Sequence, residues 1–260
     1  MPELPEVEAA VRELRRWTTR RRIVALEPLH RSQARTLGTP IQRRVVGRRI
    51  TDVTRRGKHQ LIHLDDGSTL LVHFRLDGEW ARVAASAAAP RHARVAFALD
   101  DGKALYLTDP RALCTITWHA AHAPPALTLG PEPEDPALTP LELRERLRSK
   151  RGPIKPALLD QRLLAGVGNI YAQEACWHAQ INPKAVANRL SVARVEKLLA
   201  GLRTALADGH VNAGRYRTGV RTIPFKVYDR SDEPCARCEM PIKRITQAGR
   251  GTWYCGRCQK

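Results

Sequence analysis

The chain opens with residues 1–8, which read Met1-Pro2-Glu3-Leu4-Pro5-Glu6-Val7-Glu8. Proline is favoured in the first turn of a helix, and acidic side chains there are stabilised by the helix dipole. The positions of the proline and the acidic residues therefore predict that a helix starts within this stretch. A chemical interpretation stays open beside it: removal of Met1 would leave Pro2 as a free secondary amine. Because an α-amino group has a pKa of about 8, against about 10.4 for Lys, it is far more nucleophilic near neutral pH.

Composition restricts the class of protein and its partner. The chain has 260 residues, of which 43% are apolar and 27% charged, so it is globular and long enough for two domains. Its net charge of +18 predicts a polyanionic partner, and nucleic acid is the first candidate. An anionic membrane is the second, but no apolar run of 18 residues exists, and we expect no membrane partner. Glu3, Glu6 and Glu8 interrupt the first apolar residues, so we expect no signal peptide and a cytoplasmic location.

The first half of the chain changes from a helical to a strand pattern. Apolar residues at three- and four-residue spacing predict a helix from Pro5 to about Thr18. Alternating patterns separated by Asp-Gly turns then predict eight strands. The expected strands are residues 23–29, 50–55, 60–64, 69–76, 79–83, 93–99, 104–108 and 114–118. Many short strands at this spacing predict an antiparallel sandwich or barrel.

The second half is helical, which makes the fold class α+β with two domains. Residues 1–118 form the expected N-terminal β domain, and the proline-rich residues 119–140 form a linker. A helical part follows over residues 141–224, and residues 225–260, which carry four cysteines, form the last segment. The expected helices are residues 141–148, 154–164, 169–178 and 192–208.

Four cysteines near the C-terminus have zinc-ligand spacing. They form the pairs Cys235-Ala-Arg-Cys238 and Cys255-Gly-Arg-Cys258, separated by sixteen residues that suit a β-hairpin. Four thiolate ligands leave no open position, so we expect one structural Zn²⁺. Two redox dithiols are the alternative, but the βαβ setting of such motifs is missing here. The remaining cysteines, Cys114 and Cys176, lie in apolar surroundings and are expected to be buried thiols.

Three separated stretches together resemble the bacterial formamidopyrimidine-DNA glycosylase/endonuclease VIII family. They are residues 2–8, the glycine turn Leu164-Ala165-Gly166-Val167-Gly168-Asn169-Ile170-Tyr171-Ala172, and the four-cysteine hairpin. Residues 108–111, Thr-Asp-Pro-Arg, add to the resemblance, which covers nearly the whole chain. It implies a base-excision repair enzyme with an N-terminal β-sandwich, a helix–two-turns–helix element and a zinc finger. It also implies damaged double-stranded DNA as the partner, and we expect a monomer.

The resemblance assigns catalytic roles to three residues. Pro2 matches the nucleophile that attacks C1′ of the damaged nucleotide, displaces the base and forms an iminium with the opened sugar. A cationic iminium is an electron sink for β/δ-elimination of the flanking phosphates. Glu3 matches the family's acid/base residue. Lys58 matches an essential lysine near the lesion phosphate, although without the family it would be read as a solvated strand end.

DNA-binding roles follow in the same way. His73, Asn169 and Arg250 match phosphate-gripping positions, and backbone N–H groups at Asn169 are expected to face the phosphate. Lys155 matches another functional lysine. Glu6 matches a second acidic position near the N-terminus and is expected to be structural or to orient the site. Glu174 either orients the site or is a buried structural carboxylate.

A flipped-out nucleotide leaves a gap that the family fills with three wedge residues. Leu76 and Arg111 match two of them, but Leu113 stands where the formamidopyrimidine branch has an aromatic residue. Leu4 resembles that branch, whereas the loop after Leu76 resembles endonuclease VIII. Residues 209–224 match no lesion-capping pattern and are expected to form a mobile loop.

We therefore expect a glycosylase and AP lyase that favours oxidised purines such as 8-oxoguanine and formamidopyrimidines. The alternatives are an endonuclease VIII-like enzyme for oxidised pyrimidines and a non-catalytic binder of damaged DNA. A zinc-ribbon module of the ribosome or of a polymerase would leave residues 1–8 unexplained.

Overall fold

The structure, a computed structural model, describes residues 2–212 and 225–260. The chain divides into two compact units. Residues 6–127 with Pro2 form the first, and residues 128–260 with residues 3–5 form the second. No helix in the described ranges is long and apolar enough to cross a membrane.

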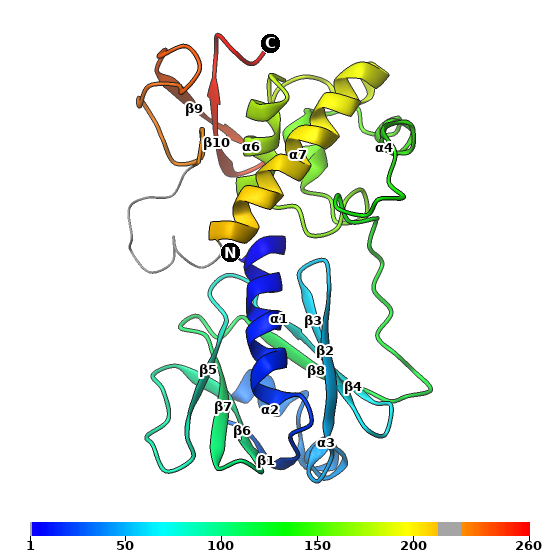
Figure 1. The fold of residues 1–260 in the computed structure, drawn as a ribbon, viewed down its shortest axis with the longest axis vertical. Helices are drawn as coiled ribbons and strands as arrows, with labels where there is room; N and C mark the ends of the chain where they lie inside the picture. The colour runs from blue at the N-terminus through cyan, green and yellow to red at the C-terminus, as the bar shows by residue number, and fades with distance from the viewer. Residues whose placement is uncertain (1, 213–224) are drawn as a thin grey trace. The chain divides into compact units, whose positions relative to one another are not determined.

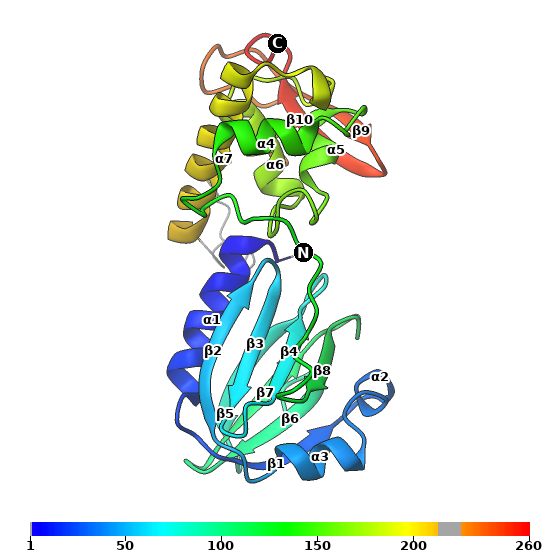
Figure 2. The same ribbon diagram turned by 90° about the vertical axis from the view of Figure 1, so that its right-hand side faces the viewer.

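Two four-stranded antiparallel sheets make up most of the first unit (Figures 1 and 2). One has the order β2-β3-β4-β8 and consists of β2 (Ile50–Arg56), β3 (His59–Leu64), β4 (Thr69–His73) and β8 (Thr115–His119). The other has the order β1-β6-β7-β5 and consists of β1 (Ile23–Pro28), β6 (Ala93–Leu99), β7 (Lys103–Thr108) and β5 (Glu79–Ala84). Inward residues of both sheets, such as Ile62, Val72, Phe97 and Leu107, form one buried core. The predicted sandwich is confirmed.

Three helices accompany the sheets. The helix α1 (Leu4–Thr18) buries Val7, Val11 and Leu14 in the sandwich core, while its arginines remain exposed. Figure 2 draws α1 beside β2. The short helices α2 (Arg31–Ala34) and α3 (Thr39–Val45) were not predicted, because one or two turns hold too few residues to show a period.

One predicted strand is too long. The strand β4 ends at His73 rather than at residue 76, because the chain turns at once. Gly78 donates its N–H to the carbonyl of Phe74 over 3.1 Å, and Arg75 has a φ of 60°. The physical reason is that a strand cannot continue through a left-handed residue. Leu76 therefore lies in a turn between β4 and β5.

In the part of the second unit that the structure describes, five helical segments pack around an apolar core. They are α4 (Pro140–Leu147), α5 (Ile154–Leu158), α6 (Asn169–His178), the 3₁₀ segment η1 (Ala187–Arg189) and α7 (Val192–Asn212). The predicted helix over residues 154–164 is wrong beyond Leu158. Asp160 and Gln161 there bind nearby backbone groups instead: Asp160 accepts from the N–H of Arg162, and Gln161 donates to the carbonyl of Val167. Such local bonds compete with a helix.

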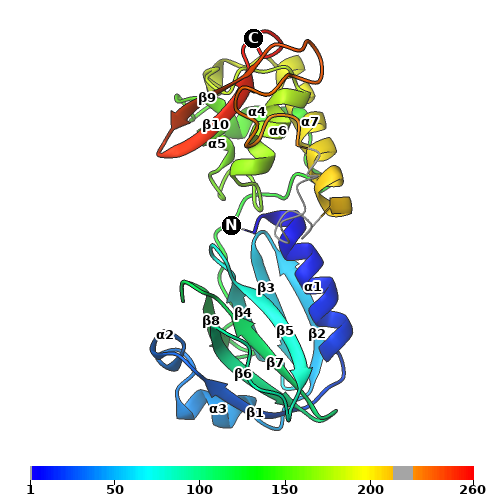
Figure 3. The same ribbon diagram turned by 90° about the vertical axis from the view of Figure 1, so that its left-hand side faces the viewer.

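The metal-binding hairpin consists of β9 (Ile242–Gln247) and β10 (Arg250–Cys255), which pair antiparallel. Ala248 and Gly249 connect them with φ values of 48° and 71°, as a tight two-residue hairpin turn requires. Figures 1 and 3 draw β10 beside α6, and the two elements are in contact. The α+β fold with a C-terminal hairpin is confirmed.

Candidate active site and metal centre

Glu3 is held at the N-terminus of α6. Its side chain is 2% exposed and accepts hydrogen bonds from the backbone N–H groups of Ile170, at 2.9 Å, and Tyr171, at 3.3 Å. The first N–H groups of a helix lack partners within the helix, and its dipole favours a negative charge there. Glu3 therefore occupies the N–H groups of Ile170 and Tyr171. The prediction that backbone N–H groups at Asn169 face a DNA phosphate stays a prediction.

The glycine turn before α6 is shaped by the chain start. Leu4 donates its N–H to the carbonyl of Gly166 over 3.1 Å. A Cβ on Gly168 would overlap the carboxyl group of Glu3, and one on Gly166 would lie 2.6 Å from Cδ1 of Leu4. The turn thus needs glycines where residues 3 and 4 approach it. Pro2, the residue before Glu3, is buried, whereas Met1 and the expectation about its removal lie outside the described residues.

Lys155 is buried in the second unit, with no exposed surface. Burial and the charge of Arg250 lower its pKa to about 8, against the opposing effects of Cys176 and Glu3. Burial raises the pKa of Cys176 to about 12, so this thiol is neutral, and the predicted burial of Cys114 and Cys176 is confirmed. Lys155 is enclosed and cannot contact a ligand directly in this conformation. It can act on a ligand only through its charge and through the residues around it.

The contact of α6 with β10 brings two predicted phosphate positions together. Asn169 donates from Nδ2 to the carbonyl of Gly251 over 3.1 Å, next to Arg250, which is exposed. Gln173, one turn later, is fully buried and accepts the N–H of Trp253 over 2.6 Å. Gln173 was missed by the sequence analysis. Only its position four residues after Asn169, on one face of a helix, could have indicated it.

Glu174 fixes the first residues after the undescribed range. It is 3% exposed and accepts the backbone N–H groups of Lys226, Val227 and Tyr228 at 2.7 to 3.0 Å. Burial raises its pKa, and these three donors oppose that effect. Glu174 thus has the geometry of a structural carboxylate, and the expected loop over residues 209–224 lies largely outside the described residues.

In the first unit, Lys58 and His73 lie at the ends of β3 and β4. Lys58 is 6% exposed and directly precedes β3. The rings of His59 and His73, which face each other across the strands, lie 4.8 Å apart edge to face. Nδ1 of His73 accepts the N–H of Arg75 over 2.9 Å, which assigns the ring proton to Nε2. Burial and the charges of His59, Arg75 and Lys58 lower the pKa of His73 to about 3, so it is a neutral N–H donor.

A buried aspartate shapes the loop that carries Arg111. Asp109 has no exposed surface and accepts the backbone N–H groups of Arg111, Leu113 and Cys114 at 2.9, 2.7 and 2.6 Å. The loop therefore presents Arg111 and Leu113 outward, and Leu113 is 44% exposed. An exposed leucine on a rigidly held loop is the geometry expected of an apolar wedge. Leu76, the other predicted wedge residue of this unit, is half-buried.

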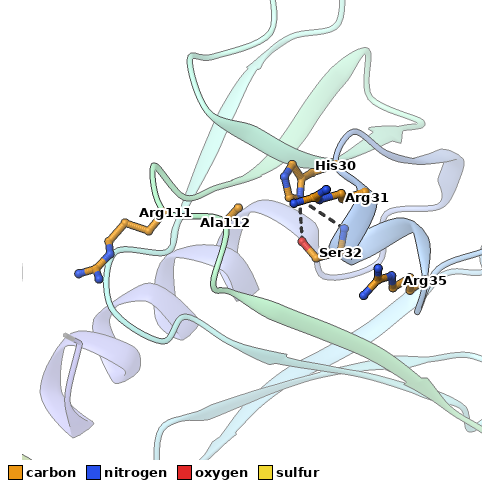
Figure 4. A pocket seen from close by; sticks show the side chains of 6 residues that line it. All are labelled: His30, Arg31, Ser32, Arg35, Arg111 and Ala112. Carbon is orange, nitrogen blue, oxygen red and sulfur yellow. Dashed lines mark hydrogen bonds between the residues drawn. The ribbon is translucent and has the colours of Figure 1, made fainter.

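A cationic pocket of about 490 Å³ lies between this loop and α2, lined by His30, Arg31, Ser32, Arg35, Arg111 and Ala112. Figure 4 shows Arg111 and Ala112 on the loop before β8 and the other residues at α2, where His30 and Ser32 are hydrogen-bonded. No carboxylate lines the pocket. The pocket was not predicted from the sequence, because only the fold brings the loop that carries Arg111 to α2.

The four predicted zinc ligands meet at one point. Their sulfur atoms all lie within 4.8 Å of one another, with Cys238 and Cys255 at 3.5 Å and Cys235 and Cys258 at 4.0 Å. A tetrahedral Zn²⁺ with bonds of about 2.3 Å would separate its sulfur ligands by about 3.8 Å. The four cysteines therefore fit one structural zinc ion, as predicted.

Sequence comparisons identify the family. Residues 1–116 match the formamidopyrimidine-DNA glycosylase N-terminal domain, residues 129–218 its H2TH domain, and residues 232–260 a zinc finger found in FPG and IleRS. A formamidopyrimidine-DNA glycosylase of Chloroflexus aggregans is 41% identical over 100% of this chain and 98% of its own length. This chain belongs to the formamidopyrimidine-DNA glycosylase family. The relative from Herpetosiphon aurantiacus is 39% identical, with 100% of both chains covered.

Solved structures of the family have the same fold. Lactococcus lactis formamidopyrimidine-DNA glycosylase, non-covalently bound to DNA containing an AP site, aligns with a TM-score of 0.91. The identity is 29%, and 99% of each chain is covered. MutM in complex with DNA containing carbocyclic 8-oxo-G also gives a TM-score of 0.91, at 30% identity with 100% of each chain covered. The recognition of a DNA glycosylase family from three motifs is confirmed.

Proposed function

We propose that this chain excises oxidised bases from duplex DNA and cuts the strand at the resulting abasic site. The observation that carries the proposal is the fixed position of Glu3, whose carboxylate is held by the N–H groups of Ile170 and Tyr171. Glu3 directly follows Pro2 in the sequence, which supports a role for this carboxylate in chemistry at the Pro2 nitrogen. A helix N-terminus that positions an acid next to the chain's own amine suits covalent catalysis.

The proposed reaction begins with Pro2, after loss of Met1. Its nitrogen forms a bond to C1′ of the damaged nucleotide, and the bond from C1′ to the base breaks with its electron pair on the base. Loss of the amine proton and opening of the sugar ring then leave an iminium. Glu3 is the general acid and base for ring opening and for the later proton transfers. Elimination follows when a C2′ proton leaves and the phosphate at C3′ departs with the bond electrons.

DNA is held by cations and neutral donors in this proposal. His73 donates from Nε2 to a phosphate, and its lowered pKa keeps that donor neutral at physiological pH. Asn169 and Arg250, joined through the α6–β10 contact, bind a phosphate in the second unit. Lys58 lies near the lesion phosphate, and Lys155 supports the site through its charge beside Arg250 and Glu3.

The wedge comprises Leu76, Arg111 and Leu113. Exposure of Leu113 on the loop held by Asp109 supports it as the third member, in place of an aromatic residue. Oxidised purines such as 8-oxoguanine and formamidopyrimidines are the preferred lesions, in line with the names of the relatives. The cationic pocket at Arg111 gives further positive surface for a duplex. The protein acts as a monomer in the bacterial cytoplasm.

Borohydride reduction tests this function. The Met-processed protein is mixed with a duplex carrying one abasic site, and reduction should trap a covalent complex that is absent from unprocessed protein. Full lyase activity in Pro2→Gly would contradict the role of Pro2. Duplexes that each carry a single oxidised purine or pyrimidine then distinguish the preferred lesion from the endonuclease VIII-like alternative. Binding to all of them without incision would indicate a non-catalytic damage-binding protein instead.

A further inference from the structure

The indole of Trp177 lies against one of the zinc ligands. Trp177 is the ninth residue of α6, is 5% exposed, and donates a hydrogen bond from Nε1 to Sγ of Cys235 over 3.5 Å. Cys235 itself is 1% exposed, so the contact is shielded from water. An indole nitrogen can only donate, and a thiolate sulfur can only accept, so the direction of this bond is fixed.

Arg237 packs against the ring of Trp177. Its guanidinium lies 3.7 Å from the centroid of the Trp177 ring and donates hydrogen bonds to the carbonyls of Trp177 and His178. Those carbonyls are at the C-terminus of α6, where a cation is favoured. Arg237 lies between Cys235 and Cys238 in the sequence. Trp177 and Arg237 therefore connect the first Cys-x-x-Cys pair to the C-terminal end of α6.

We propose that Trp177 is a positioning residue of the zinc centre, whose N–H to Cys235 slows the loss of the ion. A hydrogen bond to a metal-bound sulfur withdraws charge from it and occupies a lone pair that a proton would need in order to displace the ion. Groups that contact metal ligands in this way commonly change metal affinity by about 10- to 100-fold. The contact also joins the centre to α6, whose other end carries Asn169 and receives Glu3.

A second tryptophan provides a matched control. Trp253 also packs against the apolar cluster around the cysteines, but its Nε1 donates to the hydroxyl of Ser231 over 3.1 Å and not to sulfur. Trp177→Phe and Trp253→Phe therefore each remove one indole N–H beside the centre. Only Trp177→Phe removes a hydrogen bond to a ligand.

The test measures zinc release from the full-length protein into a chromogenic indicator after addition of excess chelator. Trp177→Phe should release zinc about 10-fold faster than the parent protein, and Trp253→Phe should release it at the parent rate. In the Co²⁺-substituted proteins, the sulfur-to-metal charge-transfer band should move to lower energy in Trp177→Phe alone, because its sulfur donates more strongly. Parent-like release and an unshifted band in Trp177→Phe would overturn the proposal.

Loss of packing is separated from loss of the hydrogen bond by a third protein. Benzothienylalanine at position 177 keeps the two fused rings and replaces N–H by sulfur. It should show the same band shift and faster release as Trp177→Phe. If it retains zinc like the parent protein, ring packing alone accounts for the effect and the proposal is wrong. These readouts require only the zinc site, so they do not depend on glycosylase activity.

Discussion

The carboxylate of Glu3 accepts a hydrogen bond from the backbone N–H of Ile170 over 2.9 Å, across 167 positions of sequence. This contact places Glu3 at the first turn of α6. The carboxylate of Glu3 is therefore held by an element that lies in the other half of the chain.

Glu3→Gln should weaken both the fold and the reaction. The amide can accept one of the two N–H groups but presents its own N–H₂ to the other, so we expect a loss of about 1–3 kcal/mol in the free energy of unfolding. Loss of the acid/base should lower base excision by about 10²- to 10⁴-fold. Urea unfolding and single-turnover excision measure the two effects. Glu3→Asp is the control, and excision by Glu3→Gln at the parent rate would exclude the proposed role.

Gly168→Ala should displace Glu3 while leaving the chemical identity of every proposed reacting group unchanged. A Cβ at this position overlaps the carboxyl group, so the side chain has to move away from the N–H groups of Ile170 and Tyr171. Misplacement of a catalytic group by about 1 Å can cost about 100-fold in rate. Gly152→Ala is the matched control, because a Cβ there meets no atom within 4 Å. Equal single-turnover rates for the two variants would show that the position of Glu3 is unimportant.

The neutral state of His73 predicts an acid-sensitive fold. Burial and nearby cations lower its pKa from 6.5 to about 3, so below pH 6.5 the unfolded chain binds a proton that the folded chain does not. The free energy of unfolding is therefore highest above pH 6.5 and decreases as the pH falls towards 3. Between pH 7.5 and 5 the loss from this group is about 2 kcal/mol. Urea unfolding at both pH values should show a smaller loss in His73→Asn, and equal losses would contradict the assignment.

Arg250→Ala should reduce the salt dependence of DNA binding. Each phosphate contact contributes about 0.9 to the slope of log affinity against log salt, so the variant should have a slope smaller by about 1. Arg148→Ala is the control: Arg148 is the C-cap residue of α4 and already pairs with Glu145 at 3.0 Å. Fluorescence anisotropy at several salt concentrations gives both slopes. A parent-like slope for Arg250→Ala would remove this residue from the phosphate contacts.

Removal of zinc should release the hairpin from α6. The cluster of Val227, Ile242 and the cysteines is small, so the four sulfur–metal bonds account for much of its stability. We expect chelation to change the fluorescence of Trp253 and to abolish DNA binding, since Arg250 begins β10. The sandwich of the first unit should keep its cooperative thermal transition. Tight DNA binding by the zinc-free protein would show that the hairpin is dispensable.

Local rules were sufficient for the strands of the sandwich and the longer helices of this protein. Alternating apolar residues predicted the eight strands of the sandwich, because successive side chains of a strand point to opposite faces of the sheet. The Cys-x-x-Cys spacing predicted the zinc hairpin for a similar reason, since each pair closes one short turn around the ion. The same rules extended a helix beyond Leu158, where Asp160 and Gln161 bind the backbone instead, and they missed α2 and α3.

The sequence by itself determined the elements, the four zinc ligands and the resemblance to a DNA glycosylase family. Tertiary structure alone decided which groups meet: Glu3 with the N–H groups of α6, and the indole of Trp177 with Cys235. It also decided that the loop of Arg111 and Ala112 lines a pocket together with α2. The reason is physical. A helix or turn is set by neighbours within about four positions, but a hydrogen bond between distant residues exists only when packing brings its donor and acceptor within about 3 Å.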